Sequence, residues 1–219
     1  MIVKHENTDL DPSYLSTYYG LMMKVAAVIF DLDGTLTKPY LDFNRIREEI
    51  GSVQGPLLEA MEKMTPKDRR RAEDILHRHE REAAENSELN PGVWELLREL
   101  KKQDRRLGIV TRNRRGSVQR VCQIHDLVFE GITCREDGPA KPDPFAVLHV
   151  CEQLNVAPEE SMVVGDYLFD LQSARRAGAK CVLYRSQDHS WGHEEEADYV
   201  IDHFNELLTL IADIENGKR

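Results

Sequence analysis

The sequence predicts an α/β protein with a doubly wound, mostly parallel sheet and a small all-helical insertion after the first strand. Two observations support this prediction. Apolar runs of strand length, such as residues 25–30, alternate with segments whose apolar residues recur at helical spacing. Between residues 39 and 89, only helical patterns occur. Alternating β and α units are typical of a parallel sheet with right-handed crossovers.

The first strand is expected at residues 25–30, an apolar run rich in β-branched types that is typical of a strand buried on both faces. Asp31, Asp33 and Gly34 follow it, so two carboxylates should project from the carboxyl end of the strand, where open α/β sheets bind ligands. Two acids this close repel each other unless one is protonated or a cation lies between them, and Mg²⁺ is bound through such carboxylates and phosphate oxygens. A plain Asp-Gly turn is the simpler alternative.

The insertion is expected to consist of three helices, over residues 42–50, 56–64 and 66–88. Thr65 should cap the third helix, with proline at the first helical position. The many Arg and Glu residues of this helix favour a solvated face over an anion site. The resulting division of the chain is an N-terminal extension (1–22), an α/β core (23–38 and 90–219) and the helical insertion (39–89).

The alternation of the core resumes at residue 90. Further helices are expected over residues 93–100, 117–124, 143–154, 168–177 and 204–214. Further strands are expected over residues 106–111, 128–129, 161–165, 180–184 and 199–201. The strand at 128–129 is based on two apolar residues only.

Polar residues recur where later strands end or helices begin. In chain order they are Thr111-Arg112-Asn113, Lys141-Pro142-Asp143-Pro144, and Gly165-Asp166 followed by Asp170. Each has a simpler explanation: threonine is common at strand ends, lysine is usually a surface residue, and acids cap helices. The order of the motifs and their positions on expected strand ends argue for function instead.

These motifs, together with Asp31-x-Asp33-Gly34-Thr35, resemble those of the haloacid dehalogenase-like hydrolase superfamily, in particular its phosphoglycolate-phosphatase-like members with a small helical cap. The four motifs lie within residues 25–170, and the resemblance continues to about residue 211. It implies a Rossmann-like core, a cap formed by residues 39–89, and Mg²⁺-dependent phosphatase chemistry through an aspartyl-phosphate. The insertion is short for such a cap, so an open site is expected.

The resemblance also implies a role for each motif residue. Asp31 would be the nucleophile, and Asp33 the general acid and base. Lys141 would neutralise Asp31 and the phosphate. The implied metal ligands are Asp31, Asp33 through its backbone carbonyl, Asp166 and Asp170, the last of which more simply orients waters or Lys141. The implied substrate-binding residues are Gly34, Thr111 (also counted as catalytic), Arg112, Asn113 and Lys141, although a solvated loop explains Arg112 equally well.

The leading functional prediction is hydrolysis of a small phosphorylated metabolite, since dehalogenases of this fold lack the second acid, Asp33. One alternative is a sugar-phosphate mutase, which must shelter its aspartyl-phosphate from water and is disfavoured by a small cap. Another is a non-catalytic member that binds a phosphorylated ligand or a protein, and a phosphoprotein substrate is a further hypothesis. Lys38, Tyr40 and Phe43 are candidate specificity residues, with core packing expected for the two aromatics.

The net charge and composition of the chain limit the classes of binding partner that are expected. The chain has 219 residues and a net charge of −10, with basic residues interspersed among acidic ones. Nucleic acid and anionic membranes are therefore not expected partners, and no leader pattern or membrane-spanning apolar run is present. The four cysteines are isolated, which predicts buried reduced thiols and a cytoplasmic protein. The sequence leaves open whether the protein is a monomer or a homodimer.

Overall fold

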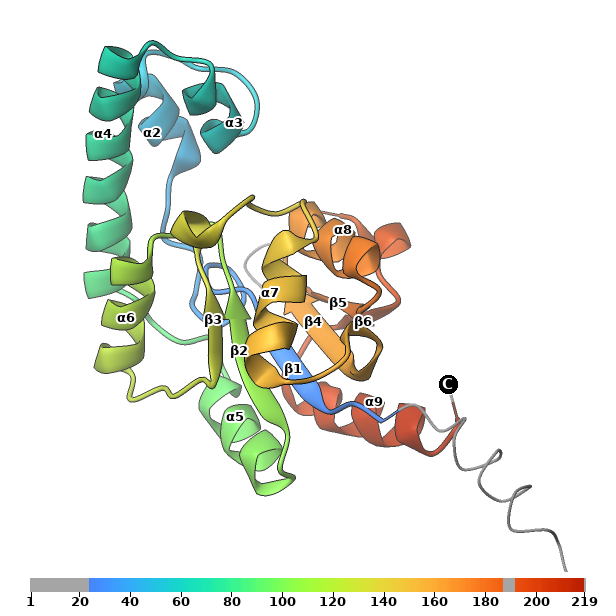
Figure 1. Ribbon diagram of the computed structural model, residues 1–219. Coiled ribbons are helices and arrows are strands. Elements are labelled where there is room, and N and C mark those ends of the chain that lie inside the picture. The colour runs from blue at the N-terminus through green and yellow to red at the C-terminus, as the bar shows by residue number, and fades with distance from the viewer. Residues whose placement is uncertain (1–23, 187–191, 219) are drawn as a thin grey trace, which may run out of the picture.

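The computed structural model describes residues 24–186 and 192–218. At its centre is an all-parallel sheet with the strand order β3-β2-β1-β4-β5-β6 (Figure 1). The strands are β1 (Ala27–Phe30), β2 (Arg106–Val110), β3 (Gly131–Thr133), β4 (Ser161–Gly165), β5 (Lys180–Tyr184) and β6 (Tyr199–Ile201). The predicted doubly wound sheet is confirmed. The predicted extension, residues 1–22, lies outside the described residues.

Helices cover both faces of the sheet (Figure 1). In β1, Val28 and Phe30 face one apolar cluster while Ala27 and Ile29 face the other, as the alternation of a strand requires. The first cluster is completed by α5 (Val93–Lys102), α6 (Arg115–Ile124) and α9 (Asn205–Glu215). The second is completed by α7 (Phe145–Leu154) and α8 (Leu168–Ala177).

The helical insertion is present, although its third helix ends at Glu85 rather than at residue 88. It contains α2 (Phe43–Ile50), α3 (Leu57–Glu62) and α4 (Pro66–Glu85), which share a small apolar cluster of Ile46, Leu57, Met61, Ala72 and Leu76. The Thr65 hydroxyl accepts a hydrogen bond from the backbone N–H of Asp68 at 3.2 Å, so the predicted cap is present. The helix α4 extends from α2 and α3 down to α6 (Figure 1), and thus links the insertion to the core.

The two ends of the insertion leave the core side by side. Thr37 and Leu89 form an antiparallel bridge. The N–H of Lys38 donates to the carbonyl of Glu88 at 2.8 Å, and the N–H of Asn90 donates to the carbonyl of Leu36 at 3.0 Å. The insertion is therefore closed at its base by backbone hydrogen bonds.

The strand predicted near residues 128–129 is present but lies two residues further along the chain. Val128 is 63% exposed, and the third strand instead begins at Gly131. A Cβ atom at Gly131 would lie 2.9 Å from a methyl group of Val150 on α7, so this strand needs a glycine where an apolar residue would normally signal a strand. The apolar pair at 128–129 was therefore a misleading signal.

Two further findings concern the bulk predictions. No helix in the described part of the chain combines the length and apolar character needed to cross a membrane. The cysteines at 122, 134, 151 and 181 are free thiols, and all except Cys122 are buried.

Candidate active site

The candidate site lies at the carboxyl ends of the central strands. Phe30, the last residue of β1, pairs with Ile109 of β2 on one side and with Val164 of β4 on the other. From β1, the sheet is extended on one side by β2 and β3 and on the other side by β4, β5 and β6. Asp31 therefore lies at the topological switch point of the sheet, where open α/β folds bind ligands. The N–H of Asp31 donates to the carbonyl of Val164 at 2.9 Å and continues the pairing.

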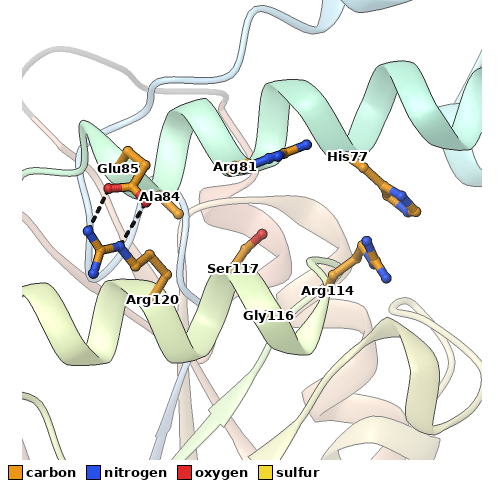
Figure 2. Close-up of a pocket in the computed structure, with 8 residues that line it drawn as sticks. All are labelled: His77, Arg81, Ala84, Glu85, Arg114, Gly116, Ser117 and Arg120. Carbon is orange, nitrogen blue, oxygen red and sulfur yellow. Dashed lines mark hydrogen bonds and ion pairs between the residues drawn. The ribbon is translucent and has the colours of Figure 1, made fainter.

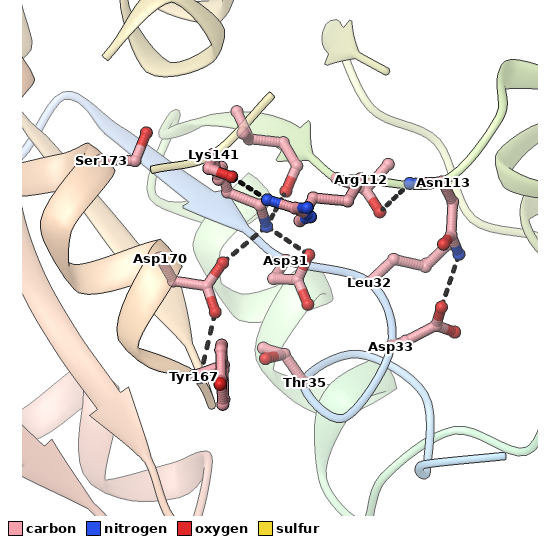
Figure 3. Close-up of polar contacts among 12 residues, drawn as sticks. Asp31, Leu32, Asp33, Thr35, Arg112, Asn113, Lys141, Tyr167, Asp170 and Ser173 are labelled. Atoms are coloured by element: carbon pink, nitrogen blue, oxygen red, sulfur yellow. Dashed lines mark hydrogen bonds and ion pairs between the residues drawn. The ribbon is translucent and has the colours of Figure 1, made fainter. Parts of the chain in front are cut away.

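Lys141 joins three segments of the site (Figure 3). Its ammonium donates to Asp31 Oδ1 and Asp170 Oδ1, each at 2.5 Å, and to the carbonyl of Val110 at 2.8 Å. Burial alone would lower the pKa of Lys141, but the charges of Asp170 and Asp31 outweigh it and raise that pKa above its usual value. Because an ammonium has three hydrogens, Lys141 is a buried cation with every hydrogen bonded.

A cluster of acids surrounds this lysine. Asp31, Asp166 and Asp170 each offer a carboxylate oxygen, and these oxygens lie within 4.8 Å of one another. Burial raises the pKa of Asp31 well above its usual range; the Lys141 charge lowers it, and the carboxylates of Asp170 and Asp166 raise it further. When all three acids are ionised, their carboxylates outnumber the single ammonium and leave an excess of negative charge on hard oxygen donors, which a bound cation would neutralise. This donor set fits Mg²⁺.

Asp170 is engaged on both carboxylate oxygens. Oδ1 accepts from Lys141, and Oδ2 accepts from the N–H of Tyr167 at 3.1 Å (Figure 3). The sequence leaves three uses open for this residue: binding the metal ion, orienting waters or orienting Lys141. Its contact with Lys141 supports the orientation of that lysine, while metal binding by Asp170 stays a prediction.

Two glycines make room for the acids. Gly34 has a φ of +85°, and a Cβ there would lie 2.3 Å from Asp166 Oδ2. A Cβ at Gly165 would lie 2.2 Å from the Cβ of Asp170. Both distances are far below any van der Waals contact, so the acids can approach the backbone only because these residues lack side chains.

Asp33 faces away from the acid cluster, toward the loop that follows β2. Its Oδ2 accepts from Asn113 Nδ2 at 2.5 Å, and its Oδ1 accepts from the Thr37 hydroxyl at 3.4 Å. Burial raises the pKa of Asp33, although the hydrogen bonds from Asn113 and Thr37 oppose that effect. The N–H of Asn113 donates to the Thr111 hydroxyl at 3.1 Å. Asn113, predicted to bind substrate, thus holds the predicted general acid; its contact with substrate stays a prediction.

The side chain of Arg112 forms an ion pair with the helical insertion. Its Nη2 donates to both carboxylate oxygens of Glu59 on α3, at 3.0 and 2.8 Å. Its Nη1 donates to the carbonyl of Lys141, and its guanidinium lies 4.9 Å from the ring centre of Phe169. The solvated loop considered for Arg112 is therefore wrong, because the side chain is only 21% exposed and ion-paired. Its predicted contact with substrate remains untested.

Sequence reasoning assigned no role to Asn90 or to Thr35, although Thr35 belongs to the first motif. The side-chain amide of Asn90, 5% exposed, donates to the carbonyls of Gly34 (3.3 Å), Thr35 (2.7 Å) and Thr37 (3.1 Å). The Thr35 hydroxyl donates to Asp166 Oδ1 at 3.2 Å. The position of Thr35 directly after the Asp-x-Asp-Gly motif could have indicated its role. Nothing in the local sequence distinguishes Asn90 from a helix-initiating residue.

The candidate specificity residues lie outside the core. Tyr40 and Phe43 are 46% and 44% exposed, so the core packing expected for these aromatics is wrong. The Tyr40 hydroxyl donates to Glu82 on α4 at 3.4 Å, and Lys38 forms an ion pair with Glu88 at 2.7 Å.

A cavity of about 350 Å³ lies apart from the acid cluster, between α4 and α6 (Figure 2). It is lined by His77, Arg81, Ala84, Glu85, Arg114, Gly116, Ser117 and Arg120. Arg120 and Glu85 pair across it through two hydrogen bonds, of 2.8 and 2.7 Å. Neither Asp31 nor Lys141 borders this cavity, so its size does not make it the catalytic site.

The site is thus an acid–lysine cluster at the switch point of an α/β sheet that carries a helical insertion. The family model for haloacid dehalogenase-like hydrolases matches residues 40–184, more than half of the chain. The chain belongs to this family, as the motifs predicted.

Individual relatives agree with this assignment. An uncharacterized hydrolase of Saccharomyces cerevisiae is 31% identical over 199 residues, which cover 85% of this chain and 91% of the relative. The pyrophosphatase PpaX of Bacillus mycoides is 29% identical over 221 residues, which cover 89% of this chain and 100% of the relative. Among solved structures, a hydrolase from Pseudomonas syringae shares the fold with a TM-score of 0.75 at 22% identity, over 86% of this chain and 99% of the other.

Proposed function

We propose that this protein is a Mg²⁺-dependent phosphatase that hydrolyses a small phosphomonoester through an aspartyl-phosphate on Asp31. The observation that carries the proposal is the buried contact of Lys141 with Asp31 inside the acid cluster. It places a nucleophilic carboxylate and a fixed positive charge together at the switch point of the sheet. Membership of a hydrolase family with pyrophosphatase relatives supports the same chemistry.

In the first step, a carboxylate oxygen of Asp31 attacks phosphorus while the bond from phosphorus to the ester oxygen breaks. Asp33 donates its proton to that departing oxygen, which leaves as the alcohol. The raised pKa of Asp33 suits this role because burial favours the protonated form. Lys141 stabilises the negative charge on the phosphoryl oxygens, and the Thr111 hydroxyl can donate to one of them.

In the second step, water attacks the phosphorus of the aspartyl-phosphate. Asp33, now ionised, takes a proton from that water. The bond between phosphorus and the Asp31 oxygen breaks, which releases inorganic phosphate and restores the carboxylate.

The ion would be held by the carboxylates of Asp31 and Asp166 and by the backbone carbonyl of Asp33. When bound, Mg²⁺ supplies positive charge that offsets the repulsion between the acids and the phosphate oxygens. The Thr35 hydroxyl orients Asp166, and Gly34 leaves the space that this carboxylate fills.

Inorganic pyrophosphate is a second candidate substrate. The observation that favours it is the name and full-length coverage of the PpaX relative. The same attack by Asp31 applies, with phosphate in place of an alcohol as the leaving group.

The test is hydrolysis of p-nitrophenyl phosphate, pyrophosphate and a panel of phosphorylated metabolites, with and without Mg²⁺. Wild type is compared with Asp31→Asn and with Asp74→Asn, which removes an exposed acid of α4. We expect Mg²⁺-dependent turnover that Asp31→Asn abolishes and Asp74→Asn retains. Equal turnover by wild type and Asp31→Asn would contradict the mechanism. Transfer of phosphate between sugar hydroxyls would favour a mutase, and no turnover by folded, Mg²⁺-supplied protein would favour a binding protein.

A further inference from the structure

A buried ion pair joins the insertion to the core beside the site. Glu80 of α4 accepts from Arg135 through two hydrogen bonds, Nη1 to Oε1 at 2.6 Å and Nη2 to Oε2 at 3.1 Å. Arg135 begins the 3-10 turn that follows β3. Glu80 is only 2% exposed, and the arginine side chain is 19% exposed. The pair is therefore a shielded contact between α4 and the carboxyl end of the sheet.

Arg135 also holds the loop that follows β2. Its Nη1 donates to the carbonyl of Arg112 at 2.9 Å, and its backbone N–H donates to the carbonyl of Asn113 at 3.1 Å. The side-chain amide of Asn113 in turn donates to Asp33 at 2.5 Å (Figure 3). An unbroken series of contacts thus runs from Glu80 through Arg135 and Asn113 to Asp33.

The insertion contacts this loop at a second point. Glu59 of α3 binds the side chain of Arg112 through two hydrogen bonds, while Arg135 binds the backbone carbonyl of the same residue. Two acids of the insertion are therefore linked to Arg112, Glu59 directly and Glu80 through Arg135. A displacement of α3 or α4 relative to the sheet would act on Asn113 and, through it, on Asp33.

Stability alone is a weak explanation for the Glu80–Arg135 pair. Removing two charges from water is costly, and a buried pair is often no more stabilising than apolar residues of the same volume. Such a pair does fix the orientation of the arginine side chain, because a guanidinium that donates two hydrogen bonds to one carboxylate is held in one plane. That plane is what aims Nη1 at the carbonyl of Arg112.

We propose that Arg135, with Glu80 as its counter-ion, is a positioning residue for Asp33, so that the placement of the helical insertion sets the orientation of the general acid. The proposal rests on the proposed function, in which Asp33 protonates the leaving oxygen. It acts through Asn113 and requires no contact of Arg135 or Glu80 with substrate.

The first test uses leaving groups of different quality. Protonation by Asp33 matters little for p-nitrophenyl phosphate, whose leaving group is stable as an anion, and matters greatly for an alkyl phosphate such as ethyl phosphate. We expect Glu80→Gln and Arg135→Met to lower kcat/KM for ethyl phosphate about 10- to 100-fold, which is part of the roughly 100- to 10,000-fold that general acid catalysis contributes. The value of kcat/KM for p-nitrophenyl phosphate should fall by less than about threefold, because kcat/KM reports only the steps up to the aspartyl-phosphate and excludes the water attack that both esters share.

Glu85→Gln is the matched control, because the exposed Glu85–Arg120 pair also joins α4 to the core but touches no residue of the loop. It should leave both rates unchanged. Arg135→Lys keeps the charge and one donor, so it should recover part of the rate on ethyl phosphate. Equal losses on both esters, or no loss on ethyl phosphate, would overturn the proposal.

A second readout does not depend on turnover. Hydrogen exchange of the Asn113 side-chain amide, followed by NMR and assigned with Asn113→Ala, should be slow in wild type and in Glu85→Gln. It should be at least about tenfold faster in Glu80→Gln and Arg135→Met, because the loop no longer holds the amide against Asp33. Unchanged exchange overturns the proposal. If exchange is faster in these variants but the wild-type protein hydrolyses no ester, the positioning contact is supported. In that case it is the proposed phosphatase function that is contradicted.

Discussion

The ammonium of Lys141 lies 2.5 Å from a carboxylate oxygen of Asp31, although 110 positions separate the two residues along the chain. The lysine is only 3% exposed, so the contact replaces water at a charge that could not otherwise be buried. The same ammonium contacts Asp170, which makes Lys141 the common partner of two acids that would repel each other without it.

We expect Lys141→Met to lower kcat for p-nitrophenyl phosphate at least about 100-fold, because the positive charge beside the phosphoryl group is lost. It should also lower the free energy of unfolding by about 3–5 kcal/mol in the absence of Mg²⁺, since Asp31 and Asp170 lose their buried partner. Steady-state kinetics and urea unfolding measure the two effects. Lys102→Met, which removes an exposed lysine paired with Glu99, should change neither. Activity of Lys141→Met near the wild-type level would contradict the assigned role.

Gly34→Ala should weaken Mg²⁺ activation. The new methyl group would meet the Asp166 carboxylate, so this candidate ligand must move. Gly55→Ala is the matched control, because Gly55 also has a positive φ, +78°, but has no atom within 4 Å of its Cβ position. Both substitutions should cost about 1 kcal/mol of stability from backbone strain. Only Gly34→Ala should raise the Mg²⁺ concentration for half-maximal activity, and equal Mg²⁺ titrations of the two variants would rule out the steric argument.

Asn90→Ala should destabilise the loop that carries Asp33 and Gly34. Its buried side-chain amide donates hydrogen bonds to three backbone carbonyls. Loss of this amide should lower the free energy of unfolding by about 2–3 kcal/mol and reduce kcat. Asn86→Ala removes a comparable amide that donates to a single carbonyl at the exposed end of α4. Thermal and urea unfolding of the two variants should differ accordingly. If both variants unfold at the same denaturant concentration, Asn90 does not hold the loop.

The pH dependence of stability should change in Glu215→Gln. Hydrogen bonds from Arg105 at 2.8 and 2.9 Å lower the pKa of Glu215 below its ordinary value of 4.5. A carboxyl with a lowered pKa in the folded state binds fewer protons there than when unfolded, so its stabilisation is present above pH 4.5 and is lost as the pH falls through the folded-state pKa. Glu215→Gln should therefore cost about 1 kcal/mol at pH 7 and progressively less at lower pH.

Urea unfolding between pH 7 and pH 3 measures this effect. Arg105→Gln should reduce the pH dependence in the same way, because it removes the other half of the pair. A stability difference between wild type and Glu215→Gln that stays constant across this range would show that the charge of Glu215 contributes nothing.

The sequence was sufficient to predict those parts of the fold and site that depend on local pattern. Buried parallel strands appear as continuous apolar runs, and residues directly after such runs must meet at one edge of the sheet. This is why Asp31, Thr111 and Asp166 could be placed together from the sequence alone. The third strand was misplaced because Gly131 packs against α7, a tertiary requirement that no local pattern records.

Contacts between distant polar residues could not be predicted in the same way. Glu80 lies in a stretch of alternating charges that is typical of an exposed helix face, and it is nevertheless 2% exposed because Arg135, 55 positions away, covers it. From the sequence alone, several other arginines and glutamates could equally well form such a pair. Asn90 was missed for the same reason, since its acceptors are backbone carbonyls more than 50 positions earlier.

The backbone bridge between Thr37 and Leu89 has a consequence for how this chain could be re-engineered. The two ends of the insertion are held together at the core, so the geometry of this junction does not depend on the length of the inserted segment. Lengthening a loop whose ends are already closed also costs little entropy. We therefore expect that the chain between the two bridged residues, 38–88, can be exchanged as a module if the new segment keeps the packing of α4 on α6. A different module grafted at this junction would leave Asp31, Lys141 and Asp166 in place, while the orientation of Asp33 would follow the new module only if it again presented acids to Arg112 and Arg135.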